Sequence, residues 1–379
     1  MSKRFDMGKM IAATGNEYVT AAGDPKGITD EYISTGSYAL NALICGSIFG
    51  GIPNNKSVMF AGIESVGKSL FTGFICNSAM NMGYKAFYFE TEGATDENTF
   101  KGFKKTKGVD YAILPIKTID DLRLQAYQII DMYKAYYNSL SAEEYLKRQK
   151  ILMVVDSIGM LGSTANIKNL AKGEIKRDLT KQQALRELFR DITVDLNILK
   201  IPLIPVNHVY ETIDPYGEKF KVSGGGGGRY GASSIITLSK TKVKDSTKKF
   251  QLGVIIKAKA PKSRFIQENK EVEVYLDFKK GLDPFYGLNK FLADETILAK
   301  TKNKEVSEYY LIYRGKNESG EYDTVKGNPF KDKQIRDEIL PLIDEKVKED
   351  FCFGSSGLGN EDDEDYLDDV EVETTEEVE

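Results

Sequence analysis

A phosphate-binding loop is the clearest chemical signal in the sequence. Residues 62–69 read Gly-Ile-Glu-Ser-Val-Gly-Lys-Ser and match the pattern G-x-x-x-x-G-K-[ST]. In such a loop the glycines allow a tight turn that points backbone N–H groups at phosphate oxygens, the lysine reaches the β and γ phosphates, and the final hydroxyl binds Mg²⁺. The residues expected to hold a nucleoside triphosphate are Gly62, Ile63, Glu64, Ser65, Val66, Gly67, Lys68 and Ser69.

Carboxylates follow two further apolar runs that are typical of strands. Asp156 follows the run 151–155, and we expect it to hold Mg²⁺ together with Ser69, directly or through a water molecule. The alternative for Asp156 is a structural cap of the next element. Glu90 and Glu92 end another run and alternate onto one face, so one of them is expected to orient and deprotonate the water that hydrolysis requires.

The elements that position these residues alternate along the chain. Short apolar runs and helix-length segments take turns between residues 57 and 210, which is typical of parallel strands covered by helices on both faces. The sequence therefore predicts an α/β fold with a mostly parallel central sheet flanked by helices. The expected strands are 57–61, 86–90, 112–115, 151–155, 202–206, 234–239, 251–257 and 271–278, and the expected helices are 67–82, 118–137 and 179–200.

Composition excludes several other classes of protein. Three widely spaced cysteines and a single histidine are too few soft ligands for a structural zinc site. The sequence has neither a run of eighteen apolar residues nor a secretory leader, so we expect no membrane span and a cytoplasmic location. Residues 361–379 carry twelve carboxylates and no lysine or arginine. This segment is expected to be a disordered, solubilising tail, and the alternative is a polyanion that competes with nucleic acid for basic loops.

Several motifs in a fixed order resemble the RecA/UvsX recombinases, and most of all the UvsX-like recombinases of bacteriophages. The resemblance covers roughly residues 34–288. It is carried by the phosphate loop, by Phe-Tyr-Phe-Glu-Thr-Glu92, by Val-Val-Asp156-Ser-Ile-Gly, by Ile-Pro-Val-Asn207-His208, by the glycine run 224–228 and by Gly-Leu-Asp283-Pro-Phe-Tyr-Gly-Leu288. It implies a RecA-type P-loop ATPase core with small terminal extensions, using ATP and Mg²⁺, and a location in the host cytoplasm if the gene belongs to a phage.

The resemblance also implies roles for individual residues. The family glutamate that activates the attacking water falls at Glu92, and the position that senses the γ-phosphate falls at His208, where UvsX-like proteins carry histidine and bacterial RecA proteins glutamine. Two basic residues that contact the triphosphate of a neighbouring subunit fall at Lys262 and Arg264. The alternative pair is Lys257 and Lys259. The family tyrosine that stacks on adenine falls near Thr99, with Phe100 and Phe103 as possible substitutes.

Two segments are expected to bind DNA. Loop 1, residues 162–178, contains Lys168, Lys172, Lys176 and Arg177. Loop 2, residues 211–233, contains Lys219, Lys221, Gly226, Arg229 and Tyr230. Basic side chains can neutralise phosphates, glycine leaves backbone N–H groups accessible, and tyrosine can stack on a base. Without the resemblance, ordinary surface loops with solvated charges would be the preferred interpretation. The sequence contains no base-reading motif, which favours sequence-independent binding.

The resulting hypothesis is an ATP-dependent recombinase that forms helical filaments on single-stranded DNA and exchanges strands with homologous duplex DNA in recombination, recombination-dependent replication and repair. Expected partners are both forms of DNA, further copies of the chain, and single-strand-binding and mediator proteins. A ring helicase with the same core and a weakly hydrolysing ATP-binding mediator stay open as alternatives. The expected parts are an N-terminal oligomerisation arm (1–33), the core (34–288), a small C-terminal subdomain (289–352) and the disordered acidic tail (353–379).

Overall fold

The structure is a computed structural model of the 379-residue chain. It describes residues 9, 13, 28–93, 108–173, 180–211, 220–222, 229, 231–244, 251–291, 298–301, 310–316, 322–325 and 330–353. Several predictions fall outside these residues: the aromatic side chains near Thr99, the acidic tail beyond residue 353, most of the N-terminal arm, and five of the DNA-binding candidates, Lys176, Arg177, Lys219, Gly226 and Tyr230.

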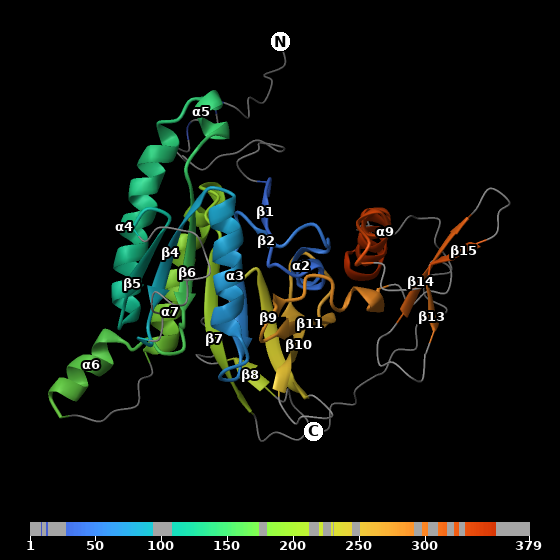
Figure 1. Cartoon of the computed structure of the whole chain (residues 1–379). Helices are drawn as coiled ribbons and strands as arrows, with labels where there is room; N and C mark the ends of the chain where they lie inside the picture. The colour runs from blue at the N-terminus through green and yellow to red at the C-terminus, as the bar shows by residue number, and fades with distance from the viewer. Residues whose placement is uncertain are drawn as a thin grey trace, which may run out of the picture.

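One large sheet organises the described part of the chain (Figure 1). Its strand order is β12-β11-β10-β9-β3-β7-β6-β4-β5, with β8 paired to β7. The strands are β3 (Val58–Gly62), β4 (Tyr84–Glu90), β5 (Tyr111–Pro115), β6 (Lys150–Asp156), β7 (Leu203–Glu211), β8 (Phe220–Val222), β9 (Ser234–Lys244), β10 (Gln251–Lys262), β11 (Glu271–Asp277) and β12 (Gly281–Leu282). The strands from β9 to β5 are parallel to one another, and the remaining pairs are antiparallel. The predicted α/β class and mostly parallel sheet are confirmed.

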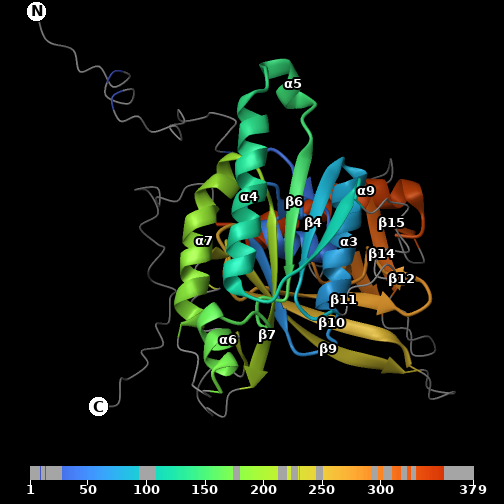
Figure 2. The ribbon, with the colours of Figure 1, turned by 90° about the vertical axis from the view of Figure 1, so that its left-hand side faces the viewer.

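Helices cover both faces of this sheet (Figures 1 and 2). The helices are α2 (Tyr38–Cys45), α3 (Lys68–Asn81), α4 (Ile119–Asn138), α5 (Ala142–Leu146), α6 (Thr164–Ala171), α7 (Lys181–Ile198) and α9 (Lys333–Phe351). Strand alternation divides the core in two: Leu152 and Val154 of β6 pack on the face of α3, whereas Met153 and Val155 pack on the face of α4 and α7. None of the described helices combines the length and apolar character needed to span a bilayer.

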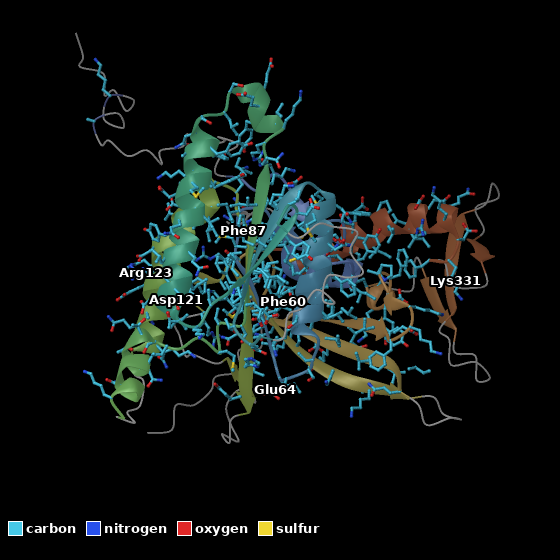
Figure 3. All side chains as sticks on the ribbon, turned by 60° about the vertical axis from the view of Figure 1, so that its left-hand side comes forward. Phe60, Glu64, Phe87, Asp121, Arg123 and Lys331 are labelled. Atoms are coloured by element: carbon cyan, nitrogen blue, oxygen red, sulfur yellow. The ribbon has the colours of Figure 1, made fainter. Side chains whose placement is uncertain are left out.

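Local sequence explains where the main helices begin. Thr118 caps α4 by accepting from the N–H of Asp121, whose side chain accepts in turn from the N–H of Thr118, which is a complete capping box. Helix α3 is different, because its N-cap is Gly67 at φ +105° and no side chain caps it. The first N–H groups of α3 are therefore left for another acceptor. In the core, the ring of Phe60, which is labelled in Figure 3, stacks on the ring of Phe71 with the two centroids 6.5 Å apart.

The expected core elements lie within a few residues of the observed ones, but three strands are longer than expected. β7, β9 and β10 each extend about five residues past the apolar run that identified them. The added part of β9 alternates lysine with Thr241 and Val243 and pairs antiparallel with β10. Such an alternating, largely exposed hairpin carries no continuous apolar run, so a search for buried parallel strands overlooks it.

The C-terminal region contains more structure than its composition indicates. β13 (Leu298–Thr301), β14 (Tyr310–Lys316) and β15 (Tyr322–Val325) form a separate antiparallel sheet, and α9 follows. Ile339, Ile343 and Val347 of α9 are fully buried and belong to the same core as α2 and α3. At the other end, β1 (Tyr32–Ile33) pairs with β2 (Ile52–Pro53). The boundaries of the arm and of the C-terminal subdomain stay predictions.

Asp344 joins α9 to the core and offers a test of this packing. Its carboxylate is 5% exposed and accepts hydrogen bonds from the N–H of Ile48 and the hydroxyl of Ser47, both at 2.7 Å. Asp344→Ala leaves these two donors and the Lys348 ammonium, which pairs with the carboxylate at 2.7 Å, without their partner. We therefore expect the free energy of unfolding to fall by about 3 kcal/mol in chemical denaturation. The control is Asp350→Ala on the same helix, which removes only a surface pair with Lys346 and should cost under about 1 kcal/mol. Equal losses in both variants would contradict this account.

Candidate functional site

The phosphate loop lies where β3 passes into α3. Gly62 ends β3 close to the backbone of Leu238 in the neighbouring strand. A Cβ atom at Gly62 would lie only 2.8 Å from the carbonyl oxygen of Leu238, so the position favours glycine. Ser65 and Gly67 both have positive φ, at +54° and +105°, so the backbone turns tightly before the helix starts. Glu64 is exposed at the edge of the molecule (Figure 3). The loop and the uncapped end of α3 together present backbone N–H groups to an anion.

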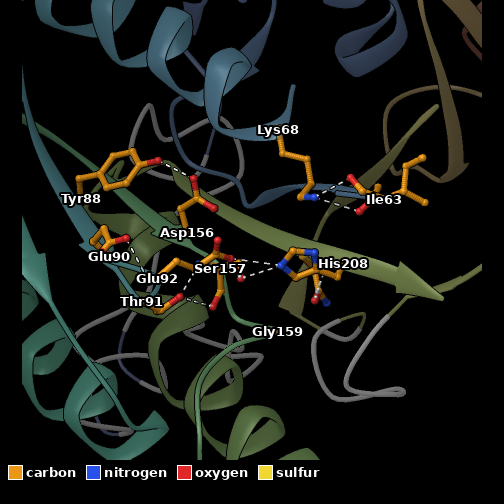
Figure 4. A network of polar contacts seen from close by, with 12 residues as sticks. Ile63, Lys68, Tyr88, Glu90, Thr91, Glu92, Asp156, Ser157, Gly159 and His208 are labelled. Carbon is orange, nitrogen blue, oxygen red and sulfur yellow. Dashed lines mark hydrogen bonds and ion pairs between the residues drawn. The ribbon is translucent and has the colours of Figure 1, made fainter. Parts of the chain in front are cut away.

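Lys68 occupies the centre of the site although it is only 7% exposed. Its Nζ donates to the carbonyl oxygens of Gly62 at 3.0 Å and Ile63 at 2.9 Å (Figure 4). Burial lowers the pKa of the Lys68 ammonium, and the carboxylates of Asp156 and Glu92 oppose this shift. The ammonium is thus partly desolvated and bonded only to neutral oxygens, and these weaker partners can be replaced by charged phosphate oxygens.

Asp156 lies at the end of β6 beside Ser69. The Asp156 side chain is 7% exposed, and it accepts a hydrogen bond from the Tyr88 hydroxyl at 2.6 Å. Burial raises the pKa of Asp156, while the hydroxyl groups of Tyr88 and Ser69 lower it. A hydroxyl and a carboxylate side by side are hard oxygen ligands of the kind that Mg²⁺ uses together with substrate phosphates. The two residues predicted to hold Mg²⁺ are therefore adjacent and fit that ion.

Glu92 and His208 meet across the ends of two strands. The Glu92 carboxylate accepts from the hydroxyl of Ser157 at 2.9 Å, and His208 Nε2 lies 3.3 Å from the same oxygen and 3.2 Å from the Ser157 hydroxyl (Figure 4). Thr91 fixes Ser157 in place, because its hydroxyl accepts from the Ser157 N–H at 2.8 Å and donates to the Ser157 carbonyl at 3.1 Å. The side chains of Glu92, Ser157 and His208 thus form one hydrogen-bonded group.

Glu90 has a different environment from Glu92. It is 5% exposed, and its two oxygens accept from the N–H groups of Glu92 at 3.0 Å and Gly93 at 2.8 Å. This carboxylate holds the turn that follows β4. Glu92 is more exposed, with a side-chain exposure of 36%, so its carboxylate is accessible from outside the site.

Three residues of the site were absent from the sequence prediction. Ser157 links Glu92 with His208, Tyr88 holds Asp156, and the Lys240 ammonium donates to the carbonyl oxygen of Ser65 in the phosphate loop. Ser157 directly follows Asp156 and could have been found from that position. Tyr88 lies inside an apolar run and Lys240 lies in the overlooked part of β9, so neither carries a signal in the sequence alone.

The two predicted DNA-binding loops start from the ends of neighbouring parallel strands. Loop 1 follows β6, and part of it is the helix α6 rather than an open loop (Figure 2). The reason is local, since the Ser163 hydroxyl accepts from the N–H of Asn166 and caps that helix. Lys168 lies on α6, and Lys172 is exposed directly after it. Lys221 lies on β8 within loop 2.

Lys262 and Arg264 lie at the opposite end of the sheet from the phosphate loop of the same chain. In the register of β9 and β10, Ala258 lies level with Gly62 at the end of β3, whereas Lys262 pairs with Ile235 near the start of β3. Arg264 follows and is exposed. The pKa of Lys262 is lowered by burial first and then by nearby cations, Arg264 among them. These residues therefore do not reach the loop of their own chain.

Loop 2 ends next to Lys262. The Lys262 ammonium donates to the carbonyl oxygens of Arg229 at 2.6 Å and Ala232 at 2.8 Å, both within the five residues before β9. The alternative pair lies elsewhere: Lys257 makes an ion pair with Glu271 at 2.7 Å, and Lys259 is exposed on the outer side of the sheet. Lys262 and Arg264 thus lie away from the phosphate loop of their own chain, and their contact with the triphosphate of a neighbouring subunit stays a prediction.

A mostly parallel sheet with G-x-x-x-x-G-K-S between strand and helix, and with carboxylates at the ends of β6 and β4 in the same sheet, defines the P-loop class of α/β proteins. Within that class, residues 6–283 match the family described as RecA N-terminal domain. The chain belongs to this family.

Curated relatives agree with the family assignment. The chain is 26% identical over 278 residues to the "Recombination and repair protein" of Enterobacteria phage T4, which covers 72% of this chain and 66% of the phage protein. It is 25% identical over 338 residues to "Protein RecA" of Thermus aquaticus, covering 88% of this chain and 92% of that protein. It is 26% identical over 324 residues to "Protein RecA" of Thermotoga neapolitana, covering 83% and 84%.

The raised pKa of Asp156 gives a prediction about stability. A carboxyl group whose pKa is higher in the folded than in the unfolded state favours folding when protonated, so its ionised form opposes folding at neutral pH. Asp156→Asn removes the charge and keeps an oxygen that can accept from Tyr88. We expect the variant to unfold at a higher denaturant concentration than the wild type at pH 8, with the gain shrinking as the pH falls through the pKa of Asp156. An Asp156→Asn variant that is less stable than the wild type both at pH 8 and below the pKa of Asp156 would contradict a raised pKa for this carboxyl group.

Proposed function

We propose that the protein is an ATP-dependent recombinase that assembles into helical filaments on single-stranded DNA and exchanges strands with homologous duplex DNA. The observation that carries this proposal is the meeting of Lys68, Asp156, Glu92 and His208 at one edge of a RecA-family sheet, from which both candidate DNA loops start. The names of the relatives, RecA and a recombination and repair protein, support the same activity.

Nucleotide binding would replace the internal hydrogen bonds of Lys68. The Lys68 ammonium leaves the carbonyl oxygens of Gly62 and Ile63 and binds the β and γ phosphates. The N-terminal N–H groups of α3 donate hydrogen bonds to the remaining phosphate oxygens. Ser69 and Asp156 are the residues that would hold Mg²⁺, which when bound neutralises phosphate charge. Phosphoryl transfer depends mainly on such positioning and charge stabilisation.

Glu92 is proposed to orient the attacking water and accept its proton. The Ser157 hydroxyl donates to this carboxylate and so fixes its orientation. Glu90 is unsuited to the role because its oxygens are used by the backbone of the same turn. A positioned general base contributes about 10²- to 10⁴-fold to a rate.

Strand β7 offers a direct connection between the nucleotide and DNA. His208 contacts Glu92 and Ser157, and three residues later Glu211 ends β7 and begins loop 2. A ligand that moves the imidazole therefore acts on the strand that carries the loop. The basic residues of loops 1 and 2 would bind the DNA backbone without regard to sequence. Single-strand-binding and mediator proteins are proposed as further partners.

The nucleotide is proposed to be shared between two copies of the chain. The phosphate loop and the pair Lys262 and Arg264 lie at opposite ends of the sheet, so a head-to-tail stack of identical subunits brings one against the other. Such a heterologous contact generates an open helical filament when the rotation does not close. The two basic residues would add positive charge on the side of the nucleotide that its own subunit leaves open.

Replacing Lys68 by alanine tests the nucleotide site. The change removes the only lysine of the phosphate loop, so we expect DNA-stimulated ATP hydrolysis to fall by at least about 10³-fold. Hydrolysis is measured with and without single-stranded DNA. Lys85→Ala, which removes only a surface contact with Asp110 at 3.4 Å, serves as the control and should leave the rate unchanged.

Electron microscopy of the wild type with single-stranded DNA and a non-hydrolysable ATP analogue separates the alternatives. Helical filaments support the proposal. Closed rings would favour the helicase, and nucleotide binding with neither filaments nor turnover would favour the mediator. A Lys68→Ala variant with normal turnover would contradict the assignment of the site.

Mixing two inactive variants tests the shared nucleotide. Lys68→Ala destroys the site on one side of the subunit contact, and a Lys262→Ala, Arg264→Ala double variant destroys it on the other. In randomly mixed filaments some contacts pair the intact half of one variant with the intact half of the other, so about one quarter of the sites should recover activity at equal amounts. ATP hydrolysis of the mixture is compared with that of each variant alone. A mixture no more active than its components would show that Lys262 and Arg264 do not act on a neighbour's nucleotide.

A further inference from the structure

Tyr88 brings a hydroxyl group into the sheet beneath the nucleotide site. It lies in β4, is 0% exposed, and its hydroxyl donates to Asp156 Oδ2 at 2.6 Å (Figure 4). In the register of the two strands Tyr88 pairs with Val154, two residues before Asp156 on the same face of the sheet. The ring is thus directed along the sheet towards the carboxylate at the end of the neighbouring strand.

Packing alone does not account for the hydroxyl. The core on this face of the sheet is lined by apolar groups such as those of Phe60, Phe71 and Val154, and a phenyl ring would occupy the same space. A buried hydroxyl stabilises a protein only where it is hydrogen-bonded, and a short bond to a charged acceptor is among the stronger ones. The bond to Asp156 therefore gives the hydroxyl a function at the site.

The carboxylate of Asp156 has a competing partner close by. The positive charge of Lys68 acts on Asp156, and a carboxylate that rotated onto this ammonium would neutralise the charge expected to bind phosphate. In the structure Lys68 is instead bonded to the carbonyl oxygens of Gly62 and Ile63, while Asp156 is held by the hydrogen bond from Tyr88. Tyr88 thus keeps the acidic and the basic group of the site apart.

We propose that Tyr88 is a positioning residue that holds Asp156 in the orientation in which, with Ser69, it binds the divalent cation of the nucleotide. Oδ2 of the carboxylate stays with Tyr88, and Oδ1 would contact the cation. This inference rests on the proposed nucleotide function and adds a determinant of its metal affinity. Residues that orient a metal ligand typically change metal affinity by about 10- to 100-fold when they are altered.

The test compares two tyrosines of the same strand. Tyr88→Phe removes the hydroxyl and keeps the ring. Tyr84→Phe makes the same change at a residue 1% exposed on the same face, whose hydroxyl donates to Glu31 at 2.5 Å, away from the site. The binding of a fluorescent ATP analogue is titrated with Mg²⁺ for both variants and the wild type, and Mn²⁺ binding in the presence of nucleotide is followed by electron paramagnetic resonance.

We expect Tyr88→Phe to raise the half-saturating metal concentration by about 10-fold or more, with unchanged nucleotide binding in the presence of a chelator. Tyr84→Phe should match the wild type. Unchanged metal affinity in Tyr88→Phe, an equal shift in both variants, or an equal loss of metal-free nucleotide binding would overturn the assignment. A wild type whose nucleotide binding depends on Mg²⁺ leaves the proposed function standing in each of these cases. A wild type that binds no nucleotide would overturn both.

Discussion

The partly buried ammonium of Lys68 is the interaction on which the rest of the site depends. Desolvation disfavours this charge. The carbonyl oxygens of the phosphate loop and the carboxylates of Asp156 and Glu92 compensate for the lost hydration. Only a parallel sheet brings the ends of β3, β6 and β7 to a single edge, so the arrangement of charges follows directly from strand direction. The covering helices and the two cores then serve to hold that edge together.

Around this charge, nearly every polar group has a defined partner. Tyr88 holds Asp156, Ser157 holds Glu92, and Thr91 holds Ser157. A connected network of this kind in a poorly hydrated site makes each hydrogen bond stronger, and it fixes the orientation of groups before a ligand arrives. The same network explains why Glu90 and Glu92 differ: the backbone of its own turn uses the carboxylate of Glu90, whereas the carboxylate of Glu92 is left more exposed.

Much of this could be predicted from the sequence, because strands buried on both faces and a phosphate loop leave strong local signals. The strand before Gly62, the helix after Gly67 and the carboxylate at Asp156 were identified in this way. Tyr88 and Lys240 could not be found, since their importance depends on which strands become neighbours. Helix α6 was missed because its charged residues were interpreted as a DNA-binding loop, although Ser163 supplies an ordinary helix cap.

The contacts of Lys262 have a mechanical consequence. An alkylammonium group has three N–H bonds, and the carbonyl oxygens of Arg229 and Ala232 occupy two of them. A third acceptor can therefore be added without displacing the first two. In the proposed filament a single cation would then be tied simultaneously to the base of the DNA-binding segment of one subunit and to the terminal phosphate of the next. A force along the DNA would therefore be transmitted to that phosphate through Lys262. Loss of the phosphate would remove one contact of Lys262 and leave its two hydrogen bonds to the DNA-binding segment in place.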